Sequence, residues 1–231
     1  RMLLVDTVQG KVISDEELKM KYASRHPYGE WLDSNLLKLK DLSIPNIRPE
    51  EIPDKRRAQL WKTYGYTYEQ YKTMMLPMAL NGSEPTSAMG CDVPLAVLSR
   101  KHQPLFNYFK QLFAQVTNPP IDSIREEIVT STNVYIGQDG NFLEDRPQNC
   151  RILQVRNPIL SETDLLKIRT MKKTGFKVET VSITYYKNTS LEKAIDRLYL
   201  EADRAHREGV TILILSDRDI DENRVPIPSL L

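Results

Sequence analysis

The first apolar positions of the chain predict two short strands followed by a helix. Apolar residues between Met2 and Ile13 fall on both sides of Gln9-Gly10, a pair that suits the turn between two paired strands. Ser14 is followed three residues later by Glu17, which is the capping-box pattern of a helix start. We therefore expect a helix to begin directly after Ser14.

A second helix is expected after His26-Pro27. It should end before Pro45, because proline disfavours helical geometry at the residue that precedes it. The segment between residues 41 and 54 contains three prolines and little apolar periodicity, so we interpret it as a linker. The apolar positions that predict the helix are Trp31, Leu32, Leu36, Leu37 and Leu39.

Two helical segments flank Gly65, one over residues 55–63 and one that begins at Thr67 with Gln70 as its capping partner. Such a pair is compatible with a helical hairpin or with a DNA-binding helix-turn-helix. The second helix, however, is apolar where base-reading side chains would lie, and it contains Pro77. We therefore favour two helices that pack against the rest of the protein.

A longer apolar helix is predicted from Pro104 to Val116. It leads into Thr117-Asn118-Pro119-Pro120, where the two prolines stiffen the chain and hold Asn118 near extended geometry. The face with helical spacing consists of Leu105, Phe106, Phe109, Leu112, Phe113 and Val116.

The C-terminal third alternates between strands and helices. Ser161 is the expected N-cap of one helix, and Thr189 with Glu192 forms a possible capping box for the other. The fold class expected is α/β, with a helical N-terminal part followed by βαβαβ units and right-handed crossovers. Strands are predicted at residues 133–136, 152–155, 176–185 and 210–215, the last fully buried, and helices at residues 161–173 and from Thr189 to Gly209.

Composition narrows the class of protein. With 231 residues, 40% of them hydrophobic, the chain can bury one large or two small cores. The 32 basic and 31 acidic residues nearly cancel, which argues against binding to nucleic acid or to an anionic membrane. No apolar run approaches the roughly 20 residues that span a bilayer, and no signal peptide is visible. We expect a soluble cytoplasmic protein, and the ends of the sequence suggest a piece of a longer polypeptide.

No complete catalytic or metal-binding set is visible. The cysteines Cys91 and Cys150 and the three histidines have none of the spacings typical of zinc or iron–sulfur sites. In α/β folds a site is expected where parallel strands end. Asp217 and Arg218 could orient a substrate carboxylate there, or could form a local ion pair or turn contact. The candidates at strand ends are Arg156-Asn157, Tyr185-Tyr186 and Ser216-Asp217-Arg218.

Several long stretches resemble the large subunit of glutamate synthase, and the ten-residue FAQVTNPPID is the most specific of them. The resemblance covers nearly the whole chain. It assigns residues 1–45 to the end of the glutamine amidotransferase domain and a connecting segment, and residues 46–231 to the central domain that precedes the FMN-binding barrel. The matching stretches include RMLLVDTVQGKVISDEELK, HPYGEWL, GYTYEQYKTMMLPMALNGSEPTSAMGCDVPLAVLS, LFNYFKQLFAQVTNPPIDSIREE, GQDGNFLED and ILILSDRD.

This resemblance implies a role inside a larger enzyme. In that family the amidotransferase domain releases ammonia from glutamine, a tunnel carries it to an FMN site, and 2-oxoglutarate becomes glutamate there with electrons from an iron–sulfur cluster. The resemblance implies that this segment has no catalytic residues and binds neither cofactor. It would contact the amidotransferase and FMN-binding domains of the same polypeptide, and the resemblance implies a pyridine-nucleotide-oxidising small subunit or ferredoxin as a further partner of the parent enzyme. The fold implied is a degenerate or incomplete (β/α) barrel related to the FMN-binding domain.

Thr117 and Asn118 match the segment that borders the ammonia tunnel in this family. A neutral molecule needs an uncharged passage with carbonyl and hydroxyl groups that can hydrogen-bond to it. Alternatively, Asn118 caps the preceding helix and the two prolines stop it. A further alternative for the whole chain is an independent module that binds a small molecule, or interacts with another protein, through Ser216, Asp217 and Arg218.

Overall fold

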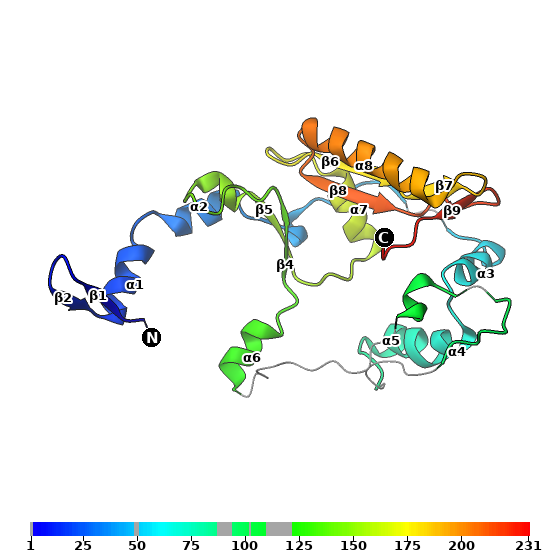
Figure 1. The fold of residues 1–231 in the computed structure, drawn as a ribbon, viewed down its shortest axis with the longest axis horizontal. Helices are drawn as coiled ribbons and strands as arrows, with labels where there is room; N and C mark the ends of the chain where they lie inside the picture. Colours follow the sequence, from blue (N-terminus) through cyan, green and yellow to red (C-terminus); the bar gives the residue numbers. More distant parts are fainter. Residues whose placement is uncertain (1, 49–50, 87–93, 102, 110–121) are drawn as a thin grey trace. The chain divides into compact units, whose positions relative to one another are not determined.

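The computed structural model describes residues 2–48, 51–86, 94–101, 103–109 and 122–231 (Figure 1). The chain packs as two compact units. Unit 1 consists of residues 1–46, 132–181 and 198–216, and unit 2 of residues 47–131, 182–197 and 217–231. The described strands form separate sheets of two or three strands and do not close into a barrel. A mixed α/β fold is thus confirmed, whereas the relation to a (β/α) barrel stays a prediction.

The N-terminal hairpin and the helix after it form as the sequence predicts. Strand β1 (Leu4–Asp6) pairs in antiparallel orientation with β2 (Lys11–Ile13). The carboxylate of Asp6 accepts hydrogen bonds from the amides of Val8 and Gln9, both at 2.9 Å, and so holds the turn. Helix α1 (Asp15–Ala23) is capped by Ser14, whose Oγ accepts from the Glu17 amide at 3.2 Å.

A three-stranded mixed sheet organises unit 1, and its middle strand is β5. Strand β5 (Ile152–Val155), which has the bounds predicted from the sequence, pairs in parallel with β3 (Leu37–Lys38) and in antiparallel orientation with β4 (Val134–Gly137). The register places Leu37, Leu153 and Ile136 in one row across the sheet. Leu153 and Val155, at 0% and 2% exposure, form the core with Leu42, Ile168 and Ile212.

The helix predicted to continue through Leu36, Leu37 and Leu39 is wrong in its second half. Helix α2 (Tyr28–Asn35) ends with Leu36 in extended geometry, and the chain then forms β3 and a 3-10 turn (Leu39–Asp41). The residues Leu37-Lys38-Leu39-Lys40 alternate between apolar and charged, which suits a strand with one buried face. The open edge of β5 lets this short segment pair, and the tertiary contact overrides the helical reading.

The second half of unit 1 has the predicted order of strands and helices. The expected βαβαβ unit is wrong in its pairing, because β5 does not share a sheet with the strands at residues 178–182 and 212–216. Helix α7 (Glu162–Thr170) is capped by Ser161 as predicted, but it ends before residues 172 and 173. Strands β6 (Val178–Ser182) and β8 (Ile212–Ser216) form a two-stranded sheet. The expectation that this last strand is fully buried is wrong. Leu213 and Leu215 are 36% and 54% exposed, because only alternate side chains of β8 face the core.

Helix α8 (Leu191–Arg207) is bounded by a serine and a glycine. The N-cap is Ser190, whose Oγ accepts from the Lys193 amide at 3.4 Å, and not Thr189 as predicted. At the other end Gly209 has φ +76°, and the amide of Val210 donates to the Ala205 carbonyl at 3.0 Å. This arrangement is a Schellman motif, which confirms the glycine as the end of the helix.

Unit 2 contains the helices that flank Gly65. Helix α3 (Asp54–Thr63) is followed by a capping box in which Thr67 and Gln70 bond to each other's backbone amides. Gly65 has φ +73° and Pro104 packs directly against it, so a side chain has no room there. Pro77 lies in the first turn of α5 and does not break the helical path. That path runs through α4 (Tyr68–Gln70), a π-helical turn (Tyr71–Met75) and α5 (Leu76–Asn81).

The helix predicted from Pro104 to Val116 begins differently in the structure. A 3-10 turn (Leu105–Tyr108) ends at Phe109, which has extended geometry, while residues 110–116 lie outside the described residues. Pro104 is itself extended, with ψ 146°, so the apolar spacing does not open an α-helix here. Helix α6 (Ser123–Val129) follows and is capped by Asp122, whose carboxylate accepts from the Arg125 amide at 2.8 Å.

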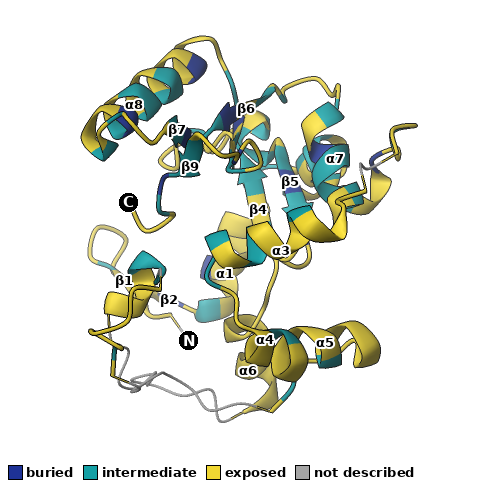
Figure 2. Cartoon of the chain, turned by 90° about the vertical axis from the view of Figure 1, so that its right-hand side faces the viewer, coloured by how far each residue is buried: buried dark blue, intermediate teal, exposed yellow. Residues whose placement is uncertain are grey.

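Unit 2 also contains a small two-stranded sheet. Strand β7 (Thr184–Tyr186) pairs in antiparallel orientation with β9 (Arg224–Pro226). The single strand predicted over residues 176–185 is thus divided between β6 and β7, which pair with different partners. Figure 2 shows buried and half-buried residues on β5, β6 and α7, whereas the surfaces of α4 and α5 are largely exposed. No helix in the described ranges is both long enough and apolar enough to cross a membrane.

The core of unit 1 should depend strongly on Leu153. Leu153→Ala removes a fully buried side chain from the middle strand, so we expect the free energy of unfolding to fall by about 3 kcal/mol. Native-state hydrogen exchange at the amides of β5 measures this loss locally. Leu143→Ala is the control, because Leu143 is 95% exposed and should change the result by less than about 0.5 kcal/mol. Equal protection of β5 in both variants would contradict the assignment of the core.

Candidate functional site

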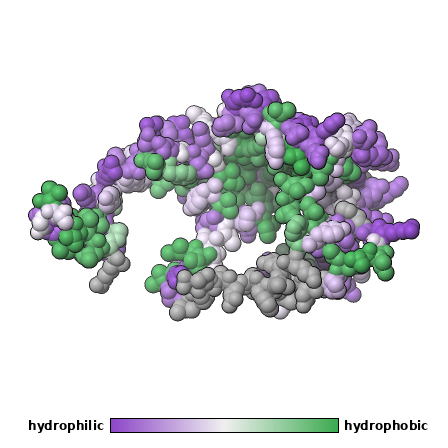
Figure 3. Space-filling view, in the orientation of Figure 1, coloured by the Kyte–Doolittle hydropathy of each residue, from purple (hydrophilic) through white to green (hydrophobic). Residues whose placement is uncertain are grey.

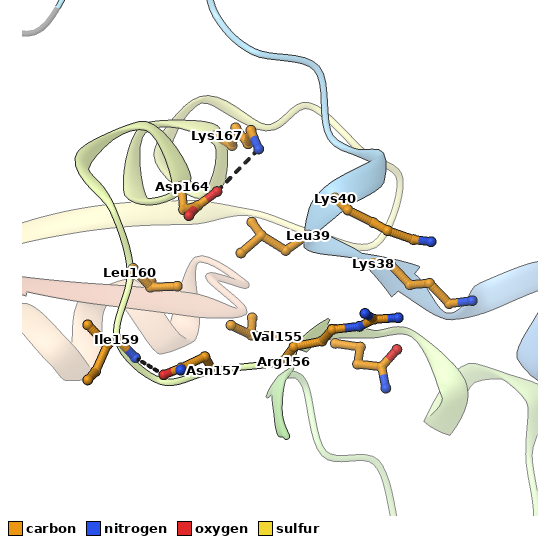
Figure 4. Close-up of a pocket in the computed structure, with 11 residues that line it drawn as sticks. Lys38, Leu39, Lys40, Val155, Arg156, Asn157, Ile159, Leu160, Asp164 and Lys167 are labelled. Atoms are coloured by element: carbon orange, nitrogen blue, oxygen red, sulfur yellow. Dashed lines mark hydrogen bonds and ion pairs between the residues drawn. The ribbon is translucent and has the colours of Figure 1, made fainter. Parts of the chain in front are cut away.

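A cavity of about 290 Å³ lies within unit 1, where β3 and β5 end (Figure 4). Its wall comes from three segments: residues 38–40, residues 154–160 without Pro158, and Asp164 with Lys167 of α7. Because β3 and β5 are parallel neighbours, their carboxyl ends meet at the same edge of the sheet. This is the position at which α/β folds commonly bind ligands.

Strand alternation divides the cavity into a charged wall and an apolar wall. The register pairs Lys38 with Gln154, and Arg156 follows two residues later on the same face of the chain. Leu39 and Val155 lie between these positions and belong to the opposite, core-facing side. In Figure 4 the cationic groups of Lys38, Lys40 and Arg156 extend to one side, while Leu39, Val155 and Leu160 lie on the other.

The first turn of α7 contributes an internally neutralised pair. The Ser161 hydroxyl donates to Asp164 Oδ2 at 2.8 Å and accepts from the Asp164 amide at 3.1 Å. Lys167 Nζ donates to Asp164 Oδ1 at 3.2 Å, and the Lys167 side chain is only 12% exposed. The Ser161 hydrogen bond, followed by Lys167, holds the pKa of Asp164 below its usual value. This carboxylate therefore stays ionised and is a poor proton acceptor near neutral pH.

The segment that links β5 to α7 is fixed by its own side chains. Asn157 Oδ1 accepts from the Ile159 amide at 2.9 Å, which forms an Asx turn. The Thr132 hydroxyl donates to the Arg156 carbonyl at 2.8 Å. Of the strand-end residues proposed from the sequence, the structure thus places Arg156 and Asn157 in the wall of this cavity.

Asp217 lies in a different environment, within unit 2. The Tyr64 hydroxyl of the segment after α3 makes a long hydrogen bond of 3.5 Å to the Asp217 carbonyl, and the Arg56 guanidinium donates to the Ile220 carbonyl. Burial, followed by the charge of Asp217, raises the pKa of the Tyr64 phenol far above its usual value, and Arg56 and Arg218 oppose this shift. The residues around Asp217 therefore fasten a turn to α3. Ser216 and Arg218 also make polar interactions.

The remaining strand-end pair does not line the cavity. Tyr185 and Tyr186 lie in β7 opposite Val225 and Arg224 of β9, and Tyr186 is 60% exposed. They belong to the small sheet of unit 2, whereas the cavity belongs to unit 1.

The other candidates from the sequence divide between the described and undescribed parts of the chain. Thr117, Asn118, Cys91 and His102 lie outside the described residues. His26 stacks on Trp31, with ring centroids 5.1 Å apart, and its Nε2 lies 3.9 Å from the Asp145 carboxylate. Within the described ranges no group of His, Cys, Asp and Glu side chains has the arrangement of a metal site.

Sequence reasoning missed the lysines of the cavity. The helical spacing of the neighbouring leucines predicts a helix over Lys38 and Lys40, which gives no indication that they lie at a strand end. The alternating residues Leu37-Lys38-Leu39-Lys40 carry the signal that could have found them, since a two-residue period predicts a strand. Lys167 gives no such signal, because its role depends on the fold that brings α7 to the sheet.

Comparison with known proteins identifies the relatives of the chain. The family described as the glutamate synthase central domain matches residues 59–231, and the class-II glutamine amidotransferases match residues 1–31. The large chain of an NADPH glutamate synthase from Bacillus subtilis is 40% identical over 232 aligned residues, which cover all of this chain and 15% of the relative.

Two further relatives differ in the electron donor that their names give. An NADH glutamate synthase from Schizosaccharomyces pombe is 39% identical over 247 aligned residues, which cover all of this chain and 12% of the relative. A ferredoxin-dependent glutamate synthase from Synechocystis is 36% identical over 239 aligned residues, again covering all of this chain and 15% of the relative. The chain therefore spans less than one sixth of the length of these relatives.

The contact of Tyr64 with Asp217 predicts how stability changes in alkali. The pKa of Tyr64 is raised on folding, so above about pH 10 the unfolded chain releases this proton first and the free energy of unfolding falls. Tyr64→Phe should cost up to about 1 kcal/mol at pH 8, and this deficit should shrink as the pH rises above 10. Urea titrations between pH 8 and 11 measure both values. In the control Tyr68→Phe, which changes a side chain 72% exposed, no such convergence is expected.

Proposed function

Because the chain belongs to the glutamate synthase central domain family, we propose that it connects the glutaminase and flavin sites of a glutamate synthase without turnover of its own. The parent enzyme would make glutamate from glutamine and 2-oxoglutarate. The match of the family over residues 59–231 is the observation that carries this proposal. Residues 1–45 would complete the amidotransferase domain and the connection to it, and residues 46–231 would form the central domain.

The surface of the N-terminal hairpin supports contact with an amidotransferase domain. Residues 1–31 match the class-II glutamine amidotransferases, and the hairpin of β1 and β2 lies within them. Val5, Val8 and Val12 are 57%, 95% and 64% exposed, and Figure 3 shows apolar side chains gathered on this hairpin. A two-stranded hairpin with so much exposed apolar surface is marginal alone, so further protein should cover it.

The chemistry of the cavity supports a role without turnover. Asp164, the only carboxylate that the described residues contribute to its lining, is held ionised by Ser161 and Lys167, so it is unsuited to accept a proton at neutral pH. Among the described residues, the lining contains no cysteine, histidine or serine that a base could activate as a nucleophile. The cavity can therefore bind and orient a molecule, but its side chains offer no complete catalytic set.

The described residues do not fit the cofactors of the parent enzyme. Cys150 is the one cysteine they contain, and a cluster needs several thiolates. A cavity of about 290 Å³ is at the lower limit of the volumes that bind drug-sized ligands, so it is too small to enclose FMN. We therefore assign FMN and the iron–sulfur cluster to other parts of the parent enzyme. Its electrons would come from a pyridine-nucleotide-oxidising subunit or from ferredoxin, the two kinds of donor in the relatives' names.

The strand and helix order supports a relation to a (β/α) barrel. Strand β5, helix α7 and strand β6 follow one another in the chain, and the cavity lies where β5 ends. Ligand sites of (β/α) barrels lie at the carboxyl ends of their strands. We therefore infer that this part of unit 1 derives from an incomplete barrel related to the FMN-binding domain.

We assign Thr117 and Asn118 to the wall of an ammonia passage. Both side chains are uncharged and can hydrogen-bond, and the two prolines that follow stiffen the backbone. Uncharged polar groups suit a passage for ammonia, since a carboxylate would hold it as ammonium. This assignment rests on the sequence and on the family.

A bulky residue in the passage should reduce ammonia transfer between the two sites without reducing the activity of either site. In the full-length parent, Thr117→Phe should obstruct the passage while glutaminase activity and ammonia-dependent glutamate synthesis, assayed separately, stay near wild type. Glutamate formed per glutamine hydrolysed should fall about tenfold or more, with free ammonia released. The control is Ile124→Phe, a bulky change at a side chain that is 78% exposed. Unchanged coupling in Thr117→Phe would leave the Thr-Asn-Pro-Pro segment as a helix stop.

The connecting role also predicts the cofactor content of the purified chain. Expressed alone with riboflavin supplied, the 231-residue chain should show no flavin absorbance after gel filtration and no glutaminase activity. A flavin-to-protein ratio approaching one would overturn the proposal, because a flavin site would then lie within this segment. The isolated amidotransferase domain of the same enzyme serves as the positive control for glutaminase activity.

A further inference from the structure

We propose that the cavity at the ends of β3 and β5 binds a small carboxylate with a short aliphatic body. This ligand site goes beyond the connecting role and does not depend on ammonia transfer. The inference rests on the uncompensated charge of one wall, the apolar character of the opposite wall, and the size of the space between them (Figure 4).

The charged wall carries positive charge that the described residues do not neutralise. Within the described ranges, no carboxylate forms an ion pair with Lys38, Lys40 or Arg156. The single acid of the lining, Asp164, is already paired with Lys167. The cavity therefore has an excess of three positive charges, whereas the chain as a whole is almost neutral at +1. Such a local field favours an anionic ligand.

The polar groups of this wall suit a planar carboxylate. A guanidinium such as that of Arg156 can donate two parallel hydrogen bonds to the two oxygens of a carboxylate. The Thr132 hydroxyl holds the Arg156 carbonyl, and the Ile159 amide occupies Asn157 Oδ1, so the backbone at this position is fixed. The Nδ2 group of Asn157, which can only donate, remains the donor end of that side chain.

The apolar wall argues for an aliphatic body on the ligand. Val155 is 2% exposed and belongs to the core, while Leu39 and Leu160 pack against that core and line the cavity. Inorganic phosphate would contact the cations but would make no apolar contact with Leu39 or Leu160. A short carboxylate can bury its methylene groups against these side chains, which favours its binding.

The size of the cavity limits the ligand. About 290 Å³ lies just below the usual range for drug-sized ligands, so a nucleotide or flavin is too large. A bound carboxylate would bridge residues 38–40 and residues 154–160, two segments that are far apart in the sequence. Binding should therefore stabilise unit 1 as a whole.

The experiment measures binding of succinate to the 231-residue chain by calorimetry and by NMR. Succinate should bind saturably with Kd of about 1 mM or below at low salt, and it should shift the amide signals of Lys38 and Asn157. Arg156→Gln should weaken binding about tenfold, since a charge-assisted bidentate contact is lost. Arg169→Gln removes the same charge from an exposed position of α7 outside the cavity and should leave Kd within about twofold.

Two comparison ligands and the full-length parent enzyme test whether the cavity selects a carboxylate with an aliphatic body. Butane-1,4-diol should not bind, and inorganic phosphate should bind more weakly than succinate. Phosphate binding as tight as succinate would overturn the aliphatic part of the proposal. Absence of saturable succinate binding up to about 10 mM, or equal weakening by Arg156→Gln and Arg169→Gln, would overturn the site. Loss of succinate binding in the full-length parent would show that another part of the polypeptide covers the cavity, and would also overturn it.

Discussion

The pairing of β3 with β5 is the constraint on which unit 1 depends. Two short segments, separated by more than a hundred residues, meet in parallel register, and this contact completes the row of Leu37, Leu153 and Ile136 across the mixed sheet. Closing a loop of that length costs conformational entropy. The pairing forms only because the core behind it gains enough free energy from the burial of apolar side chains. Leu153 and Val155 provide that gain, since each is almost completely buried between the strands and α7. The same alternation that sends these two side chains inward sends Gln154 and Arg156 outward.

The cavity is a consequence of this arrangement. Parallel strands end at the same edge, and the chain must leave that edge through turns, so a hollow with backbone and side-chain donors arises where β3 and β5 stop. The capped start of α7 completes the wall and neutralises its own acid through Ser161 and Lys167. The strand ends and the start of α7 are therefore sufficient to place a charged wall opposite an apolar wall. The fold that gives unit 1 its stability also produces the site at which it can hold an anion.

Local patterns in the sequence predict the helix starts and the strand that do not depend on pairing with one particular distant segment. Ser14, Thr67 and Ser161 cap the helices they were expected to cap, because a capping hydrogen bond spans only three residues. The strand at residues 152–155 was predicted with its observed bounds, because its apolar residues are buried whichever strand it pairs with. The Leu37-Lys38-Leu39-Lys40 segment was assigned to a helix, because its strand exists only where β5 offers an edge. The sequence predicts only part of the candidate site. Arg156 and Asn157 follow a recognisable strand, whereas Lys38, Lys40 and Lys167 reach the cavity through long-range pairing and packing.

The cavity and the N-terminal hairpin present two different kinds of surface. These surfaces suit two different roles of a connecting domain. Val8 and Val12 expose apolar surface that has no partner among the described residues, which is unfavourable in water and favours association with further protein. The cavity carries cations that no carboxylate of the described residues neutralises; water solvates them well, so the cavity needs no protein cover to be stable. Apolar surface thus favours permanent contact with a neighbouring domain, while the cationic hollow remains suited to a ligand that comes and goes. One chain can combine both kinds of surface because they belong to different elements, the hairpin and the ends of the central sheet.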